Sequence, residues 1–160
     1  MKALSLRQPW ASAIACGSKN IETRHWSTSY RGPLAIHAAK RCVKAELIHL
    51  HGHWNWCAAL KLMGVQMGQK EALWDLLPFG AIGATCDLVD CRPTGSFTGT
   101  EIDVPRYPSA ADSYGSWNYW TERMMGNFSP GRYGWVFSKV EMLKTPIPCR
   151  GRQQLFEVEI

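Results

Sequence analysis

The residues best suited to chemistry lie in one short segment, Gly17–Arg24 (GSKNIETR). Lys19 and Arg24 can hold an anion, while the Glu22 carboxylate can accept a hydrogen bond from the exocyclic amine of a nucleobase. Glu22 and Arg24 are two residues apart, so in a strand they share a face and can pair. The alternative is a surface Glu–Arg pair beside a solvated lysine, which adds little stability. The segment predicts either an anion- and base-binding site or an ordinary strand edge.

The distribution of charge along the chain points to the same kind of partner. The chain carries 18 Lys or Arg and 13 Asp or Glu, a net charge of +5. Residues 1–44 carry a net +7 and residues 123–152 a net +5, whereas residues 45–122 carry −5. If the two basic ends meet in the fold, they form one positive face suited to a polyanion. An uneven surface charge without a partner is the alternative.

Aromatic residues stand close to both basic ends. Trp10 and Trp26 belong to the first, and Tyr133 and Trp135 to the second. Aromatic rings among Lys and Arg suit stacking on unpaired bases. The competing role for each ring is packing in the core.

A histidine in the third predicted strand is a further candidate. His37 lies between Ala35 and Ala39 on one strand face, and Lys40 follows the strand. Small neighbours leave room beside an imidazole that could meet a ligand. A half-buried histidine whose nitrogens are satisfied by the protein is the alternative.

Metal and cofactor motifs are not indicated. His49, His53 and Cys57 recur at four-residue steps and could line one helix face, but they lack the paired short spacings of structural zinc sites. The sequence contains no Walker loop, dinucleotide-binding fingerprint or nucleophile elbow. We therefore expect no metal and no cofactor.

The hydrophobic pattern predicts the elements that must position these residues. Strands are predicted at residues 2–6, 20–26, 34–39, 80–89, 133–140, 145–149 and 153–160, and helices at residues 9–16, 43–63 and 70–77. Residues 92–118, rich in Pro, Gly, Ser and Thr, predict a long loop. Because helices join few of the strands, the order predicts an α+β fold with a mostly antiparallel, barrel-like sheet.

Length and composition bound the class of protein. With 160 residues, 46% apolar and 19% charged, the sequence predicts one globular domain over residues 1–160 rather than a disordered chain. No apolar stretch approaches the roughly 20 residues of a membrane span, and Arg7-Gln8-Pro9 interrupts the N-terminal apolar run before it could act as a signal peptide. Six cysteines without a CxxC pair suggest reduced thiols. We expect a cytoplasmic protein with no membrane partner.

Several motifs together resemble a known family. They are LSLRQPWA from Leu4, the pattern Gly17-x-Lys19-x-x-Glu22-x-Arg24, and YRGPLAIHA from Tyr30. PGRYGW from Pro130 and PIPCRG from Pro146 are similar to closing segments of bacterial and phage-type members. The family is the ASCH domain (activating signal cointegrator homology), and the resemblance covers nearly the whole chain apart from about residues 92–128.

The resemblance implies a PUA-like fold, a β-barrel flanked by helices with a cleft where relatives bind RNA or other nucleic acid. Carried over by motif, Lys19, Glu22 and Arg24 would line that cleft. One enzymatic branch hydrolyses acylated cytidine with a Lys, a Thr three residues later and a distant Glu. This chain keeps the lysine as Lys19 but has Glu22 in place of that threonine, with Thr23 on the opposite strand face, which argues against that activity.

We therefore expect a protein that binds single-stranded or modified RNA in a basic cleft. The residues expected to contact nucleic acid are Arg7, Trp10, Lys19, Glu22, Arg24, Trp26, His37, Lys40, Tyr133, Trp135 and Arg150. In this interpretation Lys19 and Arg24 meet phosphate, Glu22 reads a base edge and a tryptophan stacks.

Two alternatives use other chemistry. A metal-independent ribonuclease, as reported for another small branch of the family, would use Lys19 and Glu22 as catalytic residues, with Lys19 in proton transfer at a ribose 2′-hydroxyl. A protein-interaction adaptor would use the aromatic, acidic segment at residues 92–122.

Overall fold

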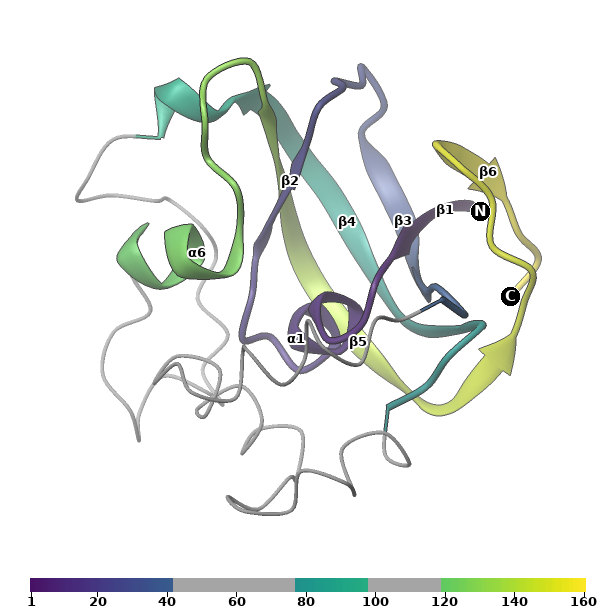
Figure 1. The fold of residues 1–160 in the computed structure, drawn as a ribbon. Helices are drawn as coiled ribbons and strands as arrows, with labels where there is room; N and C mark the ends of the chain where they lie inside the picture. Colours follow the sequence, from purple (N-terminus) through teal and green to yellow (C-terminus); the bar gives the residue numbers. More distant parts are fainter. Residues whose placement is uncertain (42–76, 98–118) are drawn as a thin grey trace, which may run out of the picture.

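One curled sheet forms the body of the protein (Figure 1). The structure is a computed structural model that describes residues 1–41, 77–97 and 119–160. Its elements are β1 (Lys2–Leu6), α1 (Trp10–Ala15), β2 (Ile21–Arg24), β3 (Gly32–Ala38), β4 (Ala81–Pro93), the 3₁₀ helix η1 (Thr94–Ser96), α6 (Tyr119–Met125), β5 (Tyr133–Pro148) and β6 (Leu155–Glu157). The six strands pair in the order β2-β5-β4-β3-β1-β6. β1 and β3 run parallel and the other pairs antiparallel, which confirms the predicted α+β, barrel-like fold.

The predicted strands and the structure differ mainly at their ends. The two strands predicted at residues 133–140 and 145–149 are one strand, β5. From Lys139 onward the side chains of β5 are mostly exposed, so no buried face marks this half in the sequence. β4 runs on to Pro93 and η1 follows, so the predicted loop from residue 92 is wrong at its start. The helices predicted at 43–63 and 70–77 (apart from Leu77), the zinc-like His/Cys spacing and residues 98–118 of the loop lie outside the described residues.

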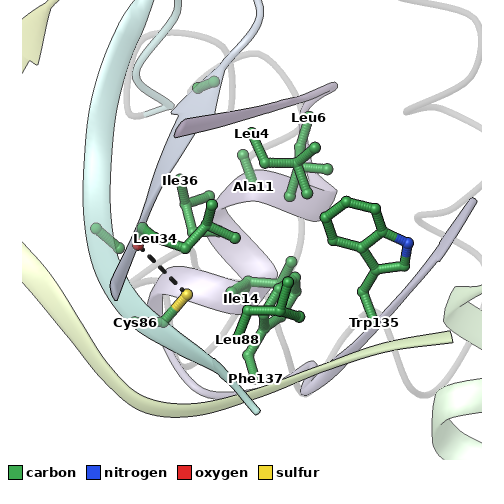
Figure 2. Close-up of a cluster of buried hydrophobic side chains, with 12 residues drawn as sticks. Leu4, Leu6, Ala11, Ile14, Leu34, Ile36, Cys86, Leu88, Trp135 and Phe137 are labelled. Carbon is green, nitrogen blue, oxygen red and sulfur yellow. Dashed lines mark hydrogen bonds between the residues drawn. The ribbon is translucent and has the colours of Figure 1, made fainter. Parts of the chain in front are cut away.

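The hydrophobic core lies inside the curl of the sheet, against α1 (Figure 2). Ala11 and Ile14 lie on the buried face of α1 and pack into this core. Opposite them, Leu4 and Leu6 of β1 and Trp135 and Phe137 of β5 are almost inaccessible to solvent. Burial of side chains of this size stabilises the fold by about 1.5–3 kcal/mol each. This core fixes β1, β5 and α1, and with them the position of β2.

The curl leaves a seam between β2 and β1. β2 pairs with β5, and β1 pairs with β3 and β6, but no described backbone pairing joins β1 to β2. Arg24 at the end of β2 bridges the seam, because its Nη2 donates a hydrogen bond to the Ser5 carbonyl at 2.5 Å. α1 lies between the two strands (Figure 1). Functional side chains gather around this seam.

Candidate functional site

The turn after α1 directs Lys19 into the protein. Gly17 has a φ of 75°, which suits glycine at a helix C-terminus, and the Ser18 and Lys19 amides both donate to the Ala13 carbonyl. The Lys19 side chain is 0% exposed, and its Nζ donates to the Ile21 carbonyl. Lys19 therefore does not line the cleft in this structure, which corrects the expectation that it meets phosphate there.

The partner of Lys19 is Glu122, in a helix that the sequence analysis did not predict. Glu122 Oε2 lies 3.6 Å from Lys19 Nζ, and the carboxylate also accepts the backbone amides of Asn20 at 2.6 Å and Ile21 at 3.3 Å. Burial raises the pKa of Glu122 above its usual value, against the opposing effects of Lys19 and the two amides. The resemblance offered one indication of such a residue, because the acylcytidine-hydrolysing branch has a glutamate far along the chain from its lysine. The motif does not fix the distance between the two residues, so it could not identify Glu122.

Further hydrogen bonds join the C-terminal end of α6 to α1 and β2. Trp10 Nε1 donates to the Met125 carbonyl at 2.9 Å, and the Asn127 amide donates to Thr23 Oγ1 at 2.9 Å. In Figure 1 α6 lies beside β2. With the Glu122 contacts, these bonds make the end of α6 one wall of a cleft next to Glu22.

The cleft has two compartments that meet at Trp10, Glu22 and Thr23. The first, here called the neutral compartment, has a volume of about 310 Å³ and is lined by Trp10, Glu22, Thr23, Met124, Met125, Gly126 and Asn127. The second, here called the cationic compartment, has a volume of about 330 Å³ and is lined by Ser5, Leu6, Arg7, Trp10, Glu22, Thr23, Arg24, His25, Ala39 and Arg132. Four of the predicted site residues, Arg7, Trp10, Glu22 and Arg24, are thus brought together.

Glu22 and Arg24 form the expected pair on one face of β2. Arg24 Nε lies 3.3 Å from Glu22 Oε1, and the two side chains are 24% and 14% exposed respectively. The Arg24 Nε–H is not aligned for a hydrogen bond, and no other described residue donates one to Glu22. The pair is therefore a contact of opposite charges that leaves the Glu22 oxygens able to accept bonds from a ligand.

Arg132 brings the second basic region to the same cleft. Its Nη2 donates a hydrogen bond at 3.0 Å to the carbonyl of Thr23, the residue before Arg24 in β2. Sequence reasoning counted Arg132 in the basic C-terminal region but did not select it as a site residue. Its position joins residues 1–44 and 123–152 at the cationic compartment.

Trp135 and Trp26 serve the core rather than the cleft. Trp135 is fully buried, and its Nε1 donates to the Trp26 carbonyl at 3.2 Å. The two rings meet edge to face with centroids 4.6 Å apart. Trp135 therefore has no free face for a base, which corrects that expectation, while Trp26 and Tyr133 pack half-buried against the core. Trp135 has a core role because it lies on the face of β5 that points into the protein.

His37 is also a structural residue, contrary to the expectation of a nucleic-acid contact. It is buried, its Nδ1 lies 3.0 Å from Ser5 Oγ and its Nε2 lies 3.1 Å from the Cys149 carbonyl. A carbonyl can only accept, so Nε2 carries the proton and Nδ1 accepts from the serine hydroxyl. Burial lowers the pKa of His37. Lys40 and Arg150 are exposed but line neither compartment of the cleft.

Comparison with known proteins places this arrangement among relatives. A family model described as the ASCH domain matches residues 4–128. Activating signal cointegrator 1 from Homo sapiens and its counterpart from Mus musculus are each 35% identical to this chain over 95 residues. The match covers 59% of this chain and 15% of each relative, so the chain corresponds to a small part of those proteins. None of the described helices has both the length and the apolar character needed to cross a membrane.

Proposed function

The chain belongs to the ASCH domain family, and on that premise we propose that it binds single-stranded RNA in the cleft beside Glu22. The family is generally associated with RNA binding. The observation that carries the proposal is the meeting of Arg7, Arg24 and Arg132 in one compartment, next to a second compartment that holds an aromatic ring and a carboxylate.

The cationic compartment supplies the attraction for a phosphate backbone. Guanidinium groups bind phosphate oxygens through charge-assisted hydrogen bonds, often two at a time. Arg24 and Arg132 are held by the backbone carbonyls of Ser5 and Thr23, so their positions are fixed before a ligand arrives. A site ordered in advance loses less conformational entropy on binding.

Trp10 takes the stacking role in this proposal. Trp10 lines both compartments, and the hydrogen bond from its Nε1 to the Met125 carbonyl restrains the indole. A fixed aromatic ring beside a positive groove is the arrangement that single-strand-binding proteins use. Trp10 replaces Trp26 and Trp135 as the tryptophan we expect to contact a base.

The buried position of Lys19 favours binding over the ribonuclease alternative. A general base must come within hydrogen-bond reach of the proton that it removes. Lys19 Nζ is instead occupied by the Ile21 carbonyl and by Glu122. The proposal therefore assigns Lys19 to holding the site together, and binding does not depend on cleavage.

The test is a titration of a fluorescently labelled, mixed-sequence single-stranded RNA at increasing salt. Binding should weaken along a negative log–log slope, because each neutralised phosphate releases counterions. Arg132→Ala should weaken binding, whereas Arg31→Ala should not, since Arg31 pairs with Asp90 and lies outside both compartments. Absence of binding at low salt would contradict the proposal. Cleavage of the RNA that persists in EDTA, and that is lost in a Lys19→Ala variant shown by circular dichroism to be folded, would instead favour the ribonuclease.

A further inference from the structure

We infer that the cleft takes one nucleotide of the RNA with a guanine base in the neutral compartment and its phosphate in the cationic compartment. This inference rests on the proposed RNA binding and adds the identity of the base. It follows from the unequal distribution of charge between the two compartments and from the hydrogen-bonding capacity of Glu22.

The two compartments differ in charge in the same way as the phosphate and the base of a nucleotide. Among the described residues, the charged side chains lining the cationic compartment are three arginines and Glu22, whereas Glu22 is the only charged side chain lining the neutral compartment. A phosphate is attracted to the first and repelled from the second. At about 310 Å³ the neutral compartment lies at the small end of the roughly 300–1,000 Å³ range of ligand pockets, which suits a single base.

The walls of the neutral compartment suit a flat, apolar ring. Trp10 contributes an aromatic surface, and Met124, which is 53% exposed, contributes a flexible thioether. Both groups make favourable contacts with aromatic systems. These contacts act on any base, so they do not distinguish one from another.

Glu22 is the group that can distinguish the bases. An ionised carboxylate only accepts hydrogen bonds, and its two oxygens match two adjacent donors. On its Watson–Crick edge guanine presents such a pair, N1–H and the N2 amine. Adenine and cytosine place a ring-nitrogen acceptor next to their amine, and uracil places a carbonyl on each side of N3–H. Against these bases the carboxylate would face an acceptor, which costs binding energy.

Arg24 keeps Glu22 suited to this task. Its guanidinium contacts Glu22 Oε1 through Nε and donates a hydrogen bond from Nη2 to the Ser5 carbonyl. It therefore orients the carboxylate at the boundary of the two compartments and can meet a phosphate on its other side. The same pair of residues thus connects recognition of the base to contact with the backbone.

The experiment compares oligouridylates that differ in one central nucleotide: guanosine, inosine, adenosine, cytidine or uridine. Guanosine should bind at least about tenfold more tightly than adenosine, cytidine and uridine, which is the discrimination typical of a good bidentate pair. Inosine keeps N1–H but lacks the N2 amine, so its affinity should lie between those of guanosine and adenosine. Equal affinity for all five RNAs would overturn the guanine assignment and leave RNA binding intact.

Two variants complete the test. Glu22→Gln should remove the preference for guanosine while overall affinity holds or rises, because a negative charge next to the backbone is lost. Glu157→Gln, an exposed carboxylate on β6 outside both compartments, should keep the preference. A preference for guanosine that persists in Glu22→Gln would overturn the role of Glu22. If none of the RNAs binds the wild type at low salt, the proposed function itself fails, and this inference with it.

Discussion

Lys19 Nζ lies 3.6 Å from Glu122 Oε2, and both side chains are buried. Burial of two charges is costly unless other hydrogen bonds satisfy them. Here the Ile21 carbonyl accepts from Lys19, and the Asn20 and Ile21 amides donate to Glu122. The pair therefore forms a small network that ties α6 to the beginning of β2 and holds the wall of the neutral compartment in place.

Glu122→Gln should strongly destabilise the protein. The glutamine oxygen can still accept the backbone amides, but the Lys19 ammonium is left buried without a counter-charge. Removal of one partner of a buried pair costs about 3–5 kcal/mol in the free energy of unfolding. Urea denaturation followed by tryptophan fluorescence measures this change.

A second substitution should restore much of that loss. Lys19→Met combined with Glu122→Gln removes the uncompensated charge, so the double variant should be more stable than Glu122→Gln alone. Glu157→Gln serves as the control, because its salt bridge to Lys2 is exposed and the unfolding midpoint should barely move. Equal stability of the wild type and Glu122→Gln would show that the network does not support the fold.

The pair also shows why part of the site escaped sequence analysis. The alternation of Ile21 to Arg24 was sufficient to predict that Glu22 and Arg24 share a strand face, and the structure confirms it. Nothing local predicts that Lys19 turns inward, because its partner lies about a hundred residues further along the chain, in α6. A lysine is expected at the surface unless such a partner exists.

Some strands could likewise be predicted from the sequence and others could not. β1, β3 and the buried part of β4 have continuous apolar faces, and the sequence predicts them within a few residues. The outer half of β5 has no buried face, and over its whole length the pairing of β5 with β4 shifts register at three places. Hydrophobic periodicity carries no information about such a strand, because backbone pairing rather than burial defines it.

Unfolding should depend on pH through His37. Burial lowers its pKa below the ordinary value of 6.5, so over the interval below 6.5 the unfolded chain binds a proton that the folded protein does not. The free energy of unfolding therefore rises with pH across this interval, and the stability contributed by neutral His37 is lost as the pH falls. Urea midpoints at about pH 7.5 and about pH 5.5 should show the loss on the acid side.

Variants identify the histidine that is responsible. His37→Gln should reduce the difference between the urea midpoints measured at the two pH values. His25→Gln, at an exposed position, should retain that difference. The raised pKa of Glu122 acts in the opposite direction above pH 4.5, and it is common to all three proteins. An unchanged difference in His37→Gln would contradict the assignment.

Gly151 should tolerate no side chain. A Cβ at this position would lie 2.7 Å from His37 Nδ1 and 2.8 Å from Ser5 Oγ, inside the hydrogen bond that joins them. Gly151→Ala should lower the free energy of unfolding by about 1–3 kcal/mol, the usual cost of overpacking. Gly95→Ala is the matched control, because a Cβ there meets nothing within 4 Å. Equal thermal unfolding midpoints for the two variants would show that the loop carrying Gly151 moves aside at little cost.

Arg24→Ala should reduce both stability and RNA affinity, because this residue bridges the seam and faces the cationic compartment. Loss of its hydrogen bond to the Ser5 carbonyl should lower the free energy of unfolding by about 1.5 kcal/mol. Loss of a phosphate contact, with Glu22 left to repel the backbone, should weaken all RNA sequences alike and reduce the salt slope by about one. Arg31→Ala, which removes an exposed contact with Asp90, should change neither quantity appreciably. If Arg24→Ala lowers stability but leaves the salt slope unchanged, Arg24 serves the seam alone and the phosphate site lies elsewhere.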